Sequence, residues 1–376
     1  MNTRPYIYID PQSIRNLAIY DYSLLSNIEG EIHYICSSHY DYKAMPQHVH
    51  QHSLFCYNNL SNNRSKALSY LWSHLRLFFL LLRVRPRVIH LQWLRIPSFD
   101  VAFYQLMKWL TGCKLVFTAH NVLPHDTGNR HKHYYGRLYA MADAIIVHTA
   151  ITRQELLDTF DIPESKVHVI AHGLLQVDYS AEALEQQRAN FDAHYQTEGC
   201  MVFSALGYQY AYKGVDLLTE VWATTPELRD NPRCKLLLVG KNRGVDLSAA
   251  EGISNVMVDD RVISDEELIY LLEHTDVYLL PYRKISQSGV LMTAIATSTP
   301  VLVTDVGGLT EPFAIAPMGW VLPKLDADQL RAQLLWLLHH PTEVAAMKQD
   351  TEAWNKLRAY YDWGRIGKLT QAVYDI

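Results

Sequence analysis

The sequence has little cysteine, no long apolar run and no apolar stretch behind a basic start. Its five cysteines are odd in number and widely spaced over 376 residues: Cys36, Cys56, Cys113, Cys200 and Cys234. That spacing indicates neither a disulfide framework nor a CxxC metal site. The most apolar stretch, Leu77–Leu82, is far shorter than the roughly 20 residues of a transmembrane helix. Because the start, MNTRPYIYIDPQ, also lacks a signal-peptide pattern, we expect a cytoplasmic protein.

Charged residues are also scarce, at 19% of the chain, and they are unevenly distributed. The net charge of -5 divides into about +4 over residues 1–178 and -9 over the remainder. A basic half beside an acidic half indicates that the two halves face different partners.

Short β-type runs alternate with longer helical patterns throughout the chain. Runs such as KLLLV at 235–239 are continuously apolar, which is typical of strands buried on both faces of a parallel sheet. Strands are predicted at 6–9, 32–36, 88–91, 114–118, 144–147, 167–170, 201–205, 235–239, 255–258, 277–280 and 301–304. Helical patterns lie between them, for example at 64–82, 264–274 and 327–339. This alternation predicts an α/β fold with helices on both faces of each sheet.

A polar stretch at 178–199, rich in Glu and Gln, separates the two halves. We therefore expect two doubly wound domains, one over residues 1–178 and one over residues 179–360. A helix at about 361–376 is expected to pack back on the first domain. Ligands of open parallel sheets bind beyond the carboxyl ends of the strands, so two such domains facing each other would form a cleft between them.

Two segments of the acidic half have the pattern of anion sites. In FSALGYQYAYKGVD, at 203–216, Lys213 and Gly214 stand where a strand gives way to a helix. In the second, the loop at 286–289 (SQSG) leads into another helix, where Gly289 would let a ligand approach the first free N–H groups. A helix start and a nearby ammonium group suit a phosphate. The alternatives are a solvated lysine and a loop that only caps its own helix.

Several segments, in this order, resemble the retaining glycosyltransferases of the GT-B fold, family 4. In the first half these are VIHLQW, LVFTAHNVLPH, ADAIIVHT and VHVIAHG, and in the second YKGVDLL and SQSGVLMTAIATSTPVLVTDVGG. The resemblance runs from about residue 88 to residue 311. It implies two doubly wound Rossmann-like domains facing across a cleft, with the acceptor bound by the first and the nucleoside-diphosphate sugar by the second.

The resemblance also implies roles for particular residues. Lys213 would bind the diphosphate, with Gly214 beside it, and the backbone at Gly289 and Val290 would face the donor phosphates. His120 would lie next to the transferred sugar. Three further residues would line the acceptor side of the cleft: Asn121, His125 and His172.

The sequence departs from the family pattern where two glutamates usually stand, because Ile285 and Thr293 occupy those positions. Gln287 or Ser288 could substitute in part. The usual arginine before the diphosphate lysine is also absent, and we hypothesise that Arg283 supplies the second positive charge. The glycine pair expected after the first strand is replaced by IDPQS at 9–13.

The resemblance implies a retaining hexosyltransferase that needs neither metal nor cofactor and acts on a polysaccharide or lipid-linked acceptor. Two alternatives stay open, namely a non-catalytic subunit that binds nucleotide sugar and a sugar-nucleotide epimerase of the same fold. The histidines at 131 and 133 and at 48, 50 and 52 are interpreted as a helix start and a loop, since zinc requires three or four convergent ligands.

The basic half contains an unusual helical segment, RSKALSYLWSHLRLFFLLLRVRPR, at 64–87. One interpretation is a core helix with charged ends. The other is an amphipathic helix on an anionic membrane surface, which would suit a lipid-linked acceptor at the inner face of the cell membrane. The positive balance of this half is interpreted as an acceptor or membrane face, and no nucleic-acid partner is expected.

Overall fold

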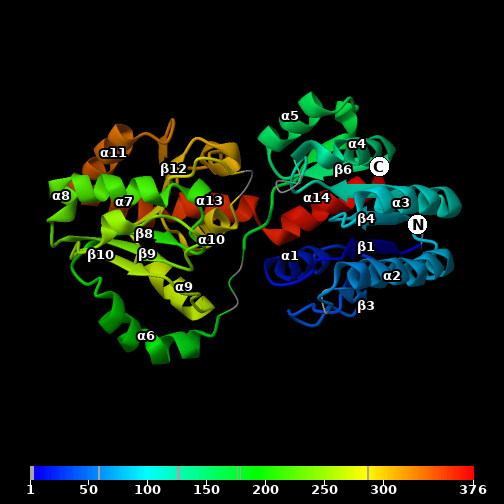
Figure 1. Ribbon diagram of the computed structural model, residues 1–376, viewed down its shortest axis with the longest axis horizontal. Coiled ribbons are helices and arrows are strands. Elements are labelled where there is room, and N and C mark those ends of the chain that lie inside the picture. Colours follow the sequence, from blue (N-terminus) through cyan, green and yellow to red (C-terminus); the bar gives the residue numbers. More distant parts are fainter. Residues whose placement is uncertain (1–3, 58–59, 125–127, 176, 178, 286–287) are drawn as a thin grey trace. The chain divides into compact units, whose positions relative to one another are not determined.

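The structure is a computed structural model that describes residues 4–57, 60–124, 128–175, 177, 179–285 and 288–376. The chain divides into two compact units (Figure 1). Unit 1 comprises residues 1–173 and 361–376, and unit 2 comprises residues 174–360. The first division falls five residues before the domain boundary expected from the sequence, because Leu174 already packs with unit 2.

The described residues of unit 1 form a seven-stranded parallel sheet in the order β3-β2-β1-β4-β5-β6-β7. Its strands are β1 (Tyr6–Asp10), β2 (Ile32–Ser37), β3 (Val49–Phe55), β4 (Val88–Leu91), β5 (Lys114–Thr118), β6 (Ala144–Val147) and β7 (Val167–Val169). Its helices are α1 (Asn16–Leu25), α2 (Asn63–Val84), α3 (Pro97–Thr111), α4 (Lys132–Met141), α5 (Ala150–Thr159) and α14 (Trp363–Asp375). Helices α2 to α5 cover one face of the sheet, and α1 and α14 cover the other.

The described residues of unit 2 form a six-stranded parallel sheet in the order β10-β9-β8-β11-β12-β13. Its strands are β8 (Met201–Leu206), β9 (Cys234–Val239), β10 (Val256–Asp259), β11 (Val277–Leu280), β12 (Val301–Thr304) and β13 (Gly319–Leu322). Its helices are α6 (Ala181–Tyr195), α7 (Val215–Thr224), α8 (Pro226–Arg229), α9 (Asp265–Glu273), α10 (Gly289–Thr297), α11 (Ala327–His339), α12 (Pro341–Gln349) and α13 (Thr351–Tyr360). Both sheets have the buried, continuously apolar central strands that the α/β prediction requires.

The last helix, α14, belongs to unit 1, where Figure 1 shows it in red beside β1 and β4. The indole ring of Trp363 packs directly on Gly173, and a Cβ added at Gly173 would be 2.3 Å from that ring. At the other end of the helix, the Tyr374 hydroxyl is 2.7 Å from His90 Nδ1, and Asp375 forms an ion pair with Arg87 at 2.8 Å. The C-terminal segment thus completes the core of the N-terminal unit.

The interpretation of residues 48–52 as a loop is wrong from Val49 onward, while His48 lies in a turn. This tract begins the edge strand β3, whose residues His50 and His52 lie beside His33 of β2. The ring nitrogens His33 Nδ1 and His52 Nε2 are 2.9 Å apart. Alternating polar residues on an exposed edge resemble a loop in sequence, because the apolar half of the usual strand pattern is missing.

Candidate functional site

Lys213 lies beyond the carboxyl end of β8, in the short turn that precedes α7. Its side chain is buried, with 7% exposed, and its ammonium Nζ is 3.5 Å from the carbonyl oxygen of Leu206. Nζ also stands 5.8 Å from the centre of the Tyr282 ring. Burial lowers the pKa of Lys213 to about 8, because the charged form loses hydration that these neighbours replace only in part.

Gly214 lets two segments of unit 2 approach each other. It has a left-handed backbone (φ 70°), and an added Cβ would be 2.1 Å from the carbonyl oxygen of Pro281. Pro281 follows β11 directly and leads toward α10. The glycine therefore allows the turn that carries Lys213 to lie against the β11–α10 connection, a contact that side chains larger than hydrogen would block.

Tyr282 links Lys213 to the start of α10. Its ring lies under the Lys213 ammonium, and its hydroxyl is hydrogen-bonded to the Ser288 side chain. Ser288 is the N-cap residue of α10 and is buried; its Oγ accepts a hydrogen bond of 3.4 Å from the Leu291 backbone. The two segments interpreted as anion sites thus meet around one tyrosine.

The N-terminus of α10 has donors available. None of the described residues accepts a hydrogen bond from the backbone N–H of Gly289 or Val290. Gln287 lies outside the described residues. The helix dipole and these N–H groups favour an anion at this end, although Ser288 itself is used as a cap.

The structure pairs Arg283 with a carboxylate. Its guanidinium forms a two-pronged ion pair with Asp216 (2.7 and 2.8 Å) and donates to the carbonyl of Ala211 at 2.6 Å. Arg283 therefore braces the Lys213 turn, and Asp216 offsets its charge. Thr293, at one of the two glutamate positions, is buried, and its hydroxyl donates to the Gly289 carbonyl at 3.3 Å.

In unit 1, His120 stands just beyond the carboxyl end of β5, where its two ring nitrogens meet two neighbouring side chains. Nδ1 is 3.2 Å from His148 Nε2, and Nε2 is 2.9 Å from Gln92 Oε1. The indole of Trp93 stacks on the His120 ring at 4.5 Å between centroids. A small pocket is lined by Gln92, Trp93, Phe117, His120, Asn121, Pro124 and Tyr135.

The positions of the ring protons on His120 and His148 can be assigned from the contact that His148 makes with the backbone. His148 Nδ1 lies 2.9 Å from the carbonyl of Ile170, so it carries a proton and donates. In a neutral His148 the other nitrogen accepts, and His120 Nδ1 must therefore donate to it. A neutral His120 then presents a bare Nε2 to the Gln92 amide, and that amide has to turn its NH2 group toward the ring.

Burial keeps these imidazoles neutral. It lowers the pKa of His148 to about 3 and that of His120 well below its usual range, and the neighbouring histidines lower the latter further. The structure instead has Oε1 facing His120 and the Gln92 NH2 group 3.0 Å from His90 Nε2, an orientation that would require a proton on His120 Nε2. The orientation of Gln92 is thus coupled to the charge of His120.

The remaining residues expected on the acceptor side lie close by or outside the described chain. His172 Nδ1 contacts the Gly173 carbonyl at 2.8 Å, and burial lowers the pKa of His172. Tyr20 contacts the rings of His120, His148 and His172, and Trp363 of α14 packs on it in turn. Asn121 follows His120 in the same loop, and His125 lies outside the described residues.

A buried pair of carboxyl groups lies where the expected glycine pair is missing. Asp10 ends β1, and Asp21 accepts hydrogen bonds from Tyr8 (2.7 Å) and Tyr34 (2.6 Å). Burial raises the pKa of Asp10 to about 7, and burial together with the neighbouring Asp10 raises that of Asp21. The two carboxyl groups are hydrogen-bonded to each other, which indicates that they share a proton.

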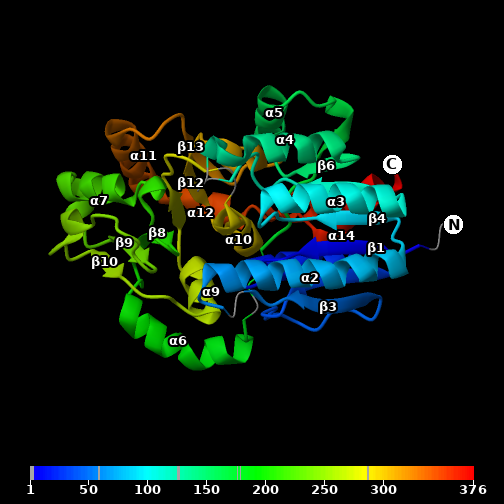
Figure 2. The ribbon, with the colours of Figure 1, turned by 45° about the vertical axis from the view of Figure 1, so that its right-hand side comes forward.

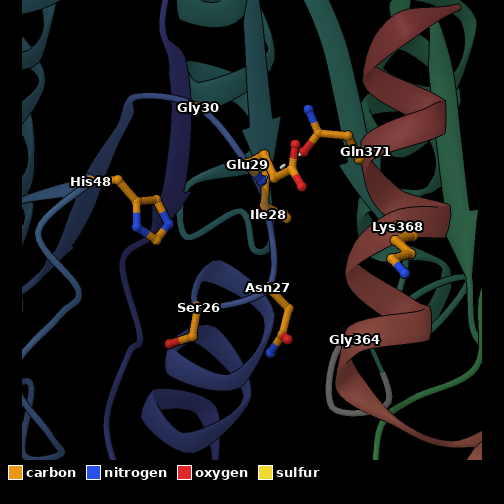
Figure 3. Close-up of a pocket in the computed structure, with 9 residues that line it drawn as sticks. All are labelled: Ser26, Asn27, Ile28, Glu29, Gly30, His48, Gly364, Lys368 and Gln371. Atoms are coloured by element: carbon orange, nitrogen blue, oxygen red, sulfur yellow. Dashed lines mark hydrogen bonds between the residues drawn. The ribbon is translucent and has the colours of Figure 1, made fainter.

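A larger pocket of unit 1 lies at the opposite end of the sheet, between the α1–β2 turn and α14 (Figure 3). Glu29 donates its backbone N–H to Gln371 there, at 2.9 Å. None of the residues predicted for the site lines this pocket, which opens at the amino ends of the strands. In the parts of the chain that the structure describes, no three His, Cys, Asp or Glu side chains are grouped as metal ligands would be.

The sequence interpretation did not include five residues that complete these two clusters. These are Tyr20, Gln92, Trp93, His148 and Tyr282. Four of them follow parallel strands within a few residues, as His120 does, and this position was a usable signal. Tyr20 lies on α1 and carried no comparable signal.

Comparison with known proteins gives two family matches, one in each half. The model for "Glycosyltransferase Family 4" matches residues 29–174, and that for "Glycosyl transferases group 1" matches residues 199–340. An uncharacterized glycosyltransferase of Methanocaldococcus jannaschii is 26% identical over 67% of this chain and 64% of its own length. Mannosylfructose-phosphate synthase of Agrobacterium fabrum is 21% identical over 63% of this chain and 54% of its own. The chain thus spans between half and two thirds of these relatives.

Solved structures resemble the chain over nearly its full length. Sucrose-phosphate synthase from Thermosynechococcus elongatus has a TM-score of 0.73 at 17% identity, covering 99% of this chain and 98% of its own. Anabaena HepE in complex with UDP and glucose has a TM-score of 0.69 at 12% identity, covering 99% and 100%. At these identities the likeness establishes the fold, which is GT-B with its two doubly wound units. Together with the two family matches, it shows that the chain belongs to the family 4-like glycosyltransferases of the GT-B fold.

Proposed function

We propose that this protein transfers a hexose, with retention and without a metal ion, from a nucleoside-diphosphate sugar to a hydroxyl group. The acceptor is a polysaccharide or a lipid-linked glycan. The observation that carries the proposal is the buried ammonium of Lys213, whose described hydrogen-bond acceptor is one carbonyl at 3.5 Å, together with the α10 N–H groups of Gly289 and Val290, for which no described residue is an acceptor.

A diphosphate would supply anionic hydrogen-bond acceptors for the Lys213 ammonium. Charge-assisted hydrogen bonds from a lysine and from helix N–H groups are among the stronger interactions that a protein can offer to phosphate. They also stabilise the leaving nucleoside diphosphate, which gains negative charge as the sugar departs. This arrangement gives a physical reason for expecting catalysis without a metal.

In the proposed step, the bond from the anomeric carbon to the phosphate oxygen breaks, and a bond to the acceptor oxygen forms on the same face. The acceptor proton passes to the departing phosphate oxygen. His120, held neutral, would pack beside the sugar with Asn121 and His172, and would orient it rather than transfer a proton. Gly214, Ser288, Gly289 and Val290 would shape the phosphate site, and Arg283 would hold the Lys213 turn. Gln287 and His125, outside the described residues, stay predictions for the donor and the acceptor side.

The test has two stages. A panel of UDP-, GDP- and ADP-sugars is screened for a rise in melting temperature, since a ligand that binds the folded state stabilises it. The stabilising donor is then incubated with glycan acceptors, and the anomeric configuration of the product is read by NMR with and without chelator. An inverted product, or one that needs added metal, would contradict the proposed mechanism.

A second candidate function is a non-catalytic nucleotide-sugar-binding subunit. The absence of carboxylates at Ile285 and Thr293 favours it, because the sugar then lacks two usual partners. An epimerase of the same fold is the other alternative. Stabilisation by a nucleotide sugar with neither transfer nor hydrolysis would support the subunit, and conversion of the free donor to its epimer would support the epimerase.

The proposal also places the protein in the cytoplasm, at the inner face of the cell membrane, where lipid-linked acceptors are available.

A further inference from the structure

Two neighbouring helices of unit 1 hold large apolar side chains in solvent. Helices α2 and α3 lie side by side on the same face of the sheet, as both ribbon views show (Figure 2). Their exposed apolar residues are Leu68, Leu71, Trp72, Leu75, Phe79, Leu106, Trp109 and Leu110, which we call the α2–α3 face. We propose that the α2–α3 face docks unit 1 on an anionic lipid bilayer.

The exposure of α2 is organised into a stripe. Leu68, Trp72, Leu75 and Phe79 recur every three or four residues and therefore line one side of the helix. The opposite side, which includes Tyr70, Leu77 and Leu81, packs on the sheet. A helix that only packs on a core needs one apolar side, whereas α2 has an apolar side against the sheet and a second apolar side in solvent. The interpretation of this segment as a core helix with charged ends is therefore incomplete.

The exposed side chains are of the kind that membrane interfaces select. Trp72 is 63% exposed, Phe79 63% and, on the neighbouring helix, Trp109 79%. Tryptophan favours the headgroup region, where its ring is buried and its N–H can bond to water or lipid. Contiguous apolar patches of this kind on soluble proteins usually mark an interaction site.

Helix α2 would lie along the membrane and not across it. Among the described helices, it is long and apolar enough to span a bilayer by length and composition, and 28% of that window is buried in the protein. The Ser73 hydroxyl donates to the Leu54 carbonyl at 2.7 Å, and the Tyr70 hydroxyl donates to Asp100 at 3.0 Å. These contacts hold the helix flat against unit 1, so only its outer stripe can enter lipid.

The charge around the α2–α3 face matches an anionic surface. Residues 61–142 contain twelve lysines and arginines and two carboxylates, Asp100 and Asp126; of the cations, Lys108 and Arg87 are paired with Asp143 and Asp375 from outside this range. Asp100 is fully buried. Arg76 and Arg83 are exposed, each four residues beyond an exposed aromatic of the stripe, and so flank it. Cations close to an anionic membrane surface strengthen binding to it.

The same charge argues against a second copy of the chain as the occupant. Two copies joined through this face would bring two basic surfaces together, with few carboxylates to offset them. Anionic lipid headgroups neutralise the arginines while the acyl region receives the aromatic rings. A bilayer therefore satisfies both features of the face.

The test uses the full chain with vesicles of phosphatidylcholine, with or without about 30% phosphatidylglycerol, and no nucleotide or acceptor. We expect co-sedimentation with the anionic vesicles and release at about 0.5 M salt. The variant Trp72→Ser/Phe79→Ser/Trp109→Ser should reduce partitioning by about tenfold or more, because it removes the inserted rings. Arg76→Glu/Arg83→Glu should weaken binding to the anionic vesicles only.

Matched controls lie on the other face of the same unit. Leu369→Ser and Lys368→Glu change an exposed apolar and an exposed basic residue of α14, and should leave partitioning unchanged. Melting temperatures should also stay unchanged, since every altered side chain is exposed. Absence of vesicle binding, or binding that the face variants do not alter, would overturn the proposal. A dimer in solution that Trp72→Ser dissociates would overturn it too, and would assign the face to a second copy.

The vesicle-binding assay contains neither nucleotide sugar nor glycan acceptor, so its outcome does not depend on the proposed transfer reaction.

Discussion

In unit 1 the ring nitrogens of His120 and His148 meet one another and their protein neighbours, whereas in unit 2 the ammonium of Lys213 has one described acceptor, at 3.5 Å. Both sites lie beyond the carboxyl ends of parallel strands and both are buried. The first is completed by the protein and stays neutral. The second keeps a costly charge that its surroundings leave largely unpaired. Burial therefore has different consequences in the two sites. It keeps the histidines of unit 1 neutral, and it leaves the Lys213 ammonium of unit 2 with a charge that a bound anion can pair.

The sharpest way to break this contrast is to remove the charge. Lys213→Met should weaken donor binding at least a hundredfold, about 3 kcal/mol, because the diphosphate loses its ammonium partner. Calorimetry with the stabilising nucleotide sugar measures this. The matched control is Lys241→Met, which removes an exposed lysine paired with Asp260 and should bind the donor normally.

The same variant should be more stable than the natural protein. The pKa of Lys213 falls from 10.5 to about 8 on folding, so its charged form is penalised at every pH below about 8, and the penalty fades as pH rises toward 10.5. Removing it should raise the free energy of unfolding at pH 7 by up to about 3 kcal/mol. An unchanged melting temperature with lost donor binding would mean that Lys213 is better paired than its contacts indicate.

The contact between the Lys213 turn and the β11–α10 connection can be disturbed by a substitution that changes no charged residue. Gly214→Ala should destabilise the protein by about 2 kcal/mol or more, because the new Cβ meets the Pro281 carbonyl and the backbone is left-handed. Gly112→Ala is the control, since Gly112 has a similar φ of 64° and no atom within 4 Å of the added Cβ. Its cost should be about 1 kcal/mol. Equal losses in denaturant unfolding would refute the steric argument.

A change of pH should affect the donor site by about tenfold. Between pH 7 and pH 9 the free protein loses the Lys213 proton, so the affinity for a nucleotide sugar should fall by about that factor. Calorimetry near pH 8 in two buffers of different ionisation enthalpy measures proton uptake on binding. Such uptake would show that protonation of Lys213 causes the pH dependence. In Lys213→Met the remaining affinity should not change over this range, and a slope that persists there would point to another group.

The smallest expected effect tests the neutral row of unit 1. Gln92→Glu replaces the amide beside His120 Nε2 with a carboxylate, which favours a proton on that nitrogen. The pKa of His120 should rise by about one unit or more, as read from the ring signals in an NMR titration. Gln105→Glu, on the outer surface of α3, is the control. An unchanged pKa of His120 in Gln92→Glu, or an equal rise in Gln105→Glu, would show that Gln92 does not govern the charge of His120.

The periodic part of the fold was predictable, because buried parallel strands are continuously apolar and helices repeat every 3.6 residues. Helix α11 was expected at 327–339 and is observed as Ala327–His339. The edge strands β3 and β13 were missed. Val49–Phe55 alternates with histidines, and Gly319–Leu322 begins with glycine at φ 148°, so neither has a buried-strand pattern.

The candidate site was predictable only where single residues carry a signal. Lys213 and His120 stand at strand ends, and the resemblance marked them. The partners of these residues could not be derived, because His148 and Tyr282 lie 28 and 69 positions away and meet them only through strand pairing. The role of Arg283 was also hidden, since its ion pair with Asp216 depends on the turn at Gly214.

The return of α14 to unit 1 has a consequence for how the protein is made. The ribosome releases residues 1–173 first, but Trp363, Ile366, Val373 and Tyr374 of the same core emerge only after all of unit 2. Unit 2 is one continuous segment, so it can finish folding while unit 1 still lacks a wall of its interior. The N-terminal unit, although made first, is completed last.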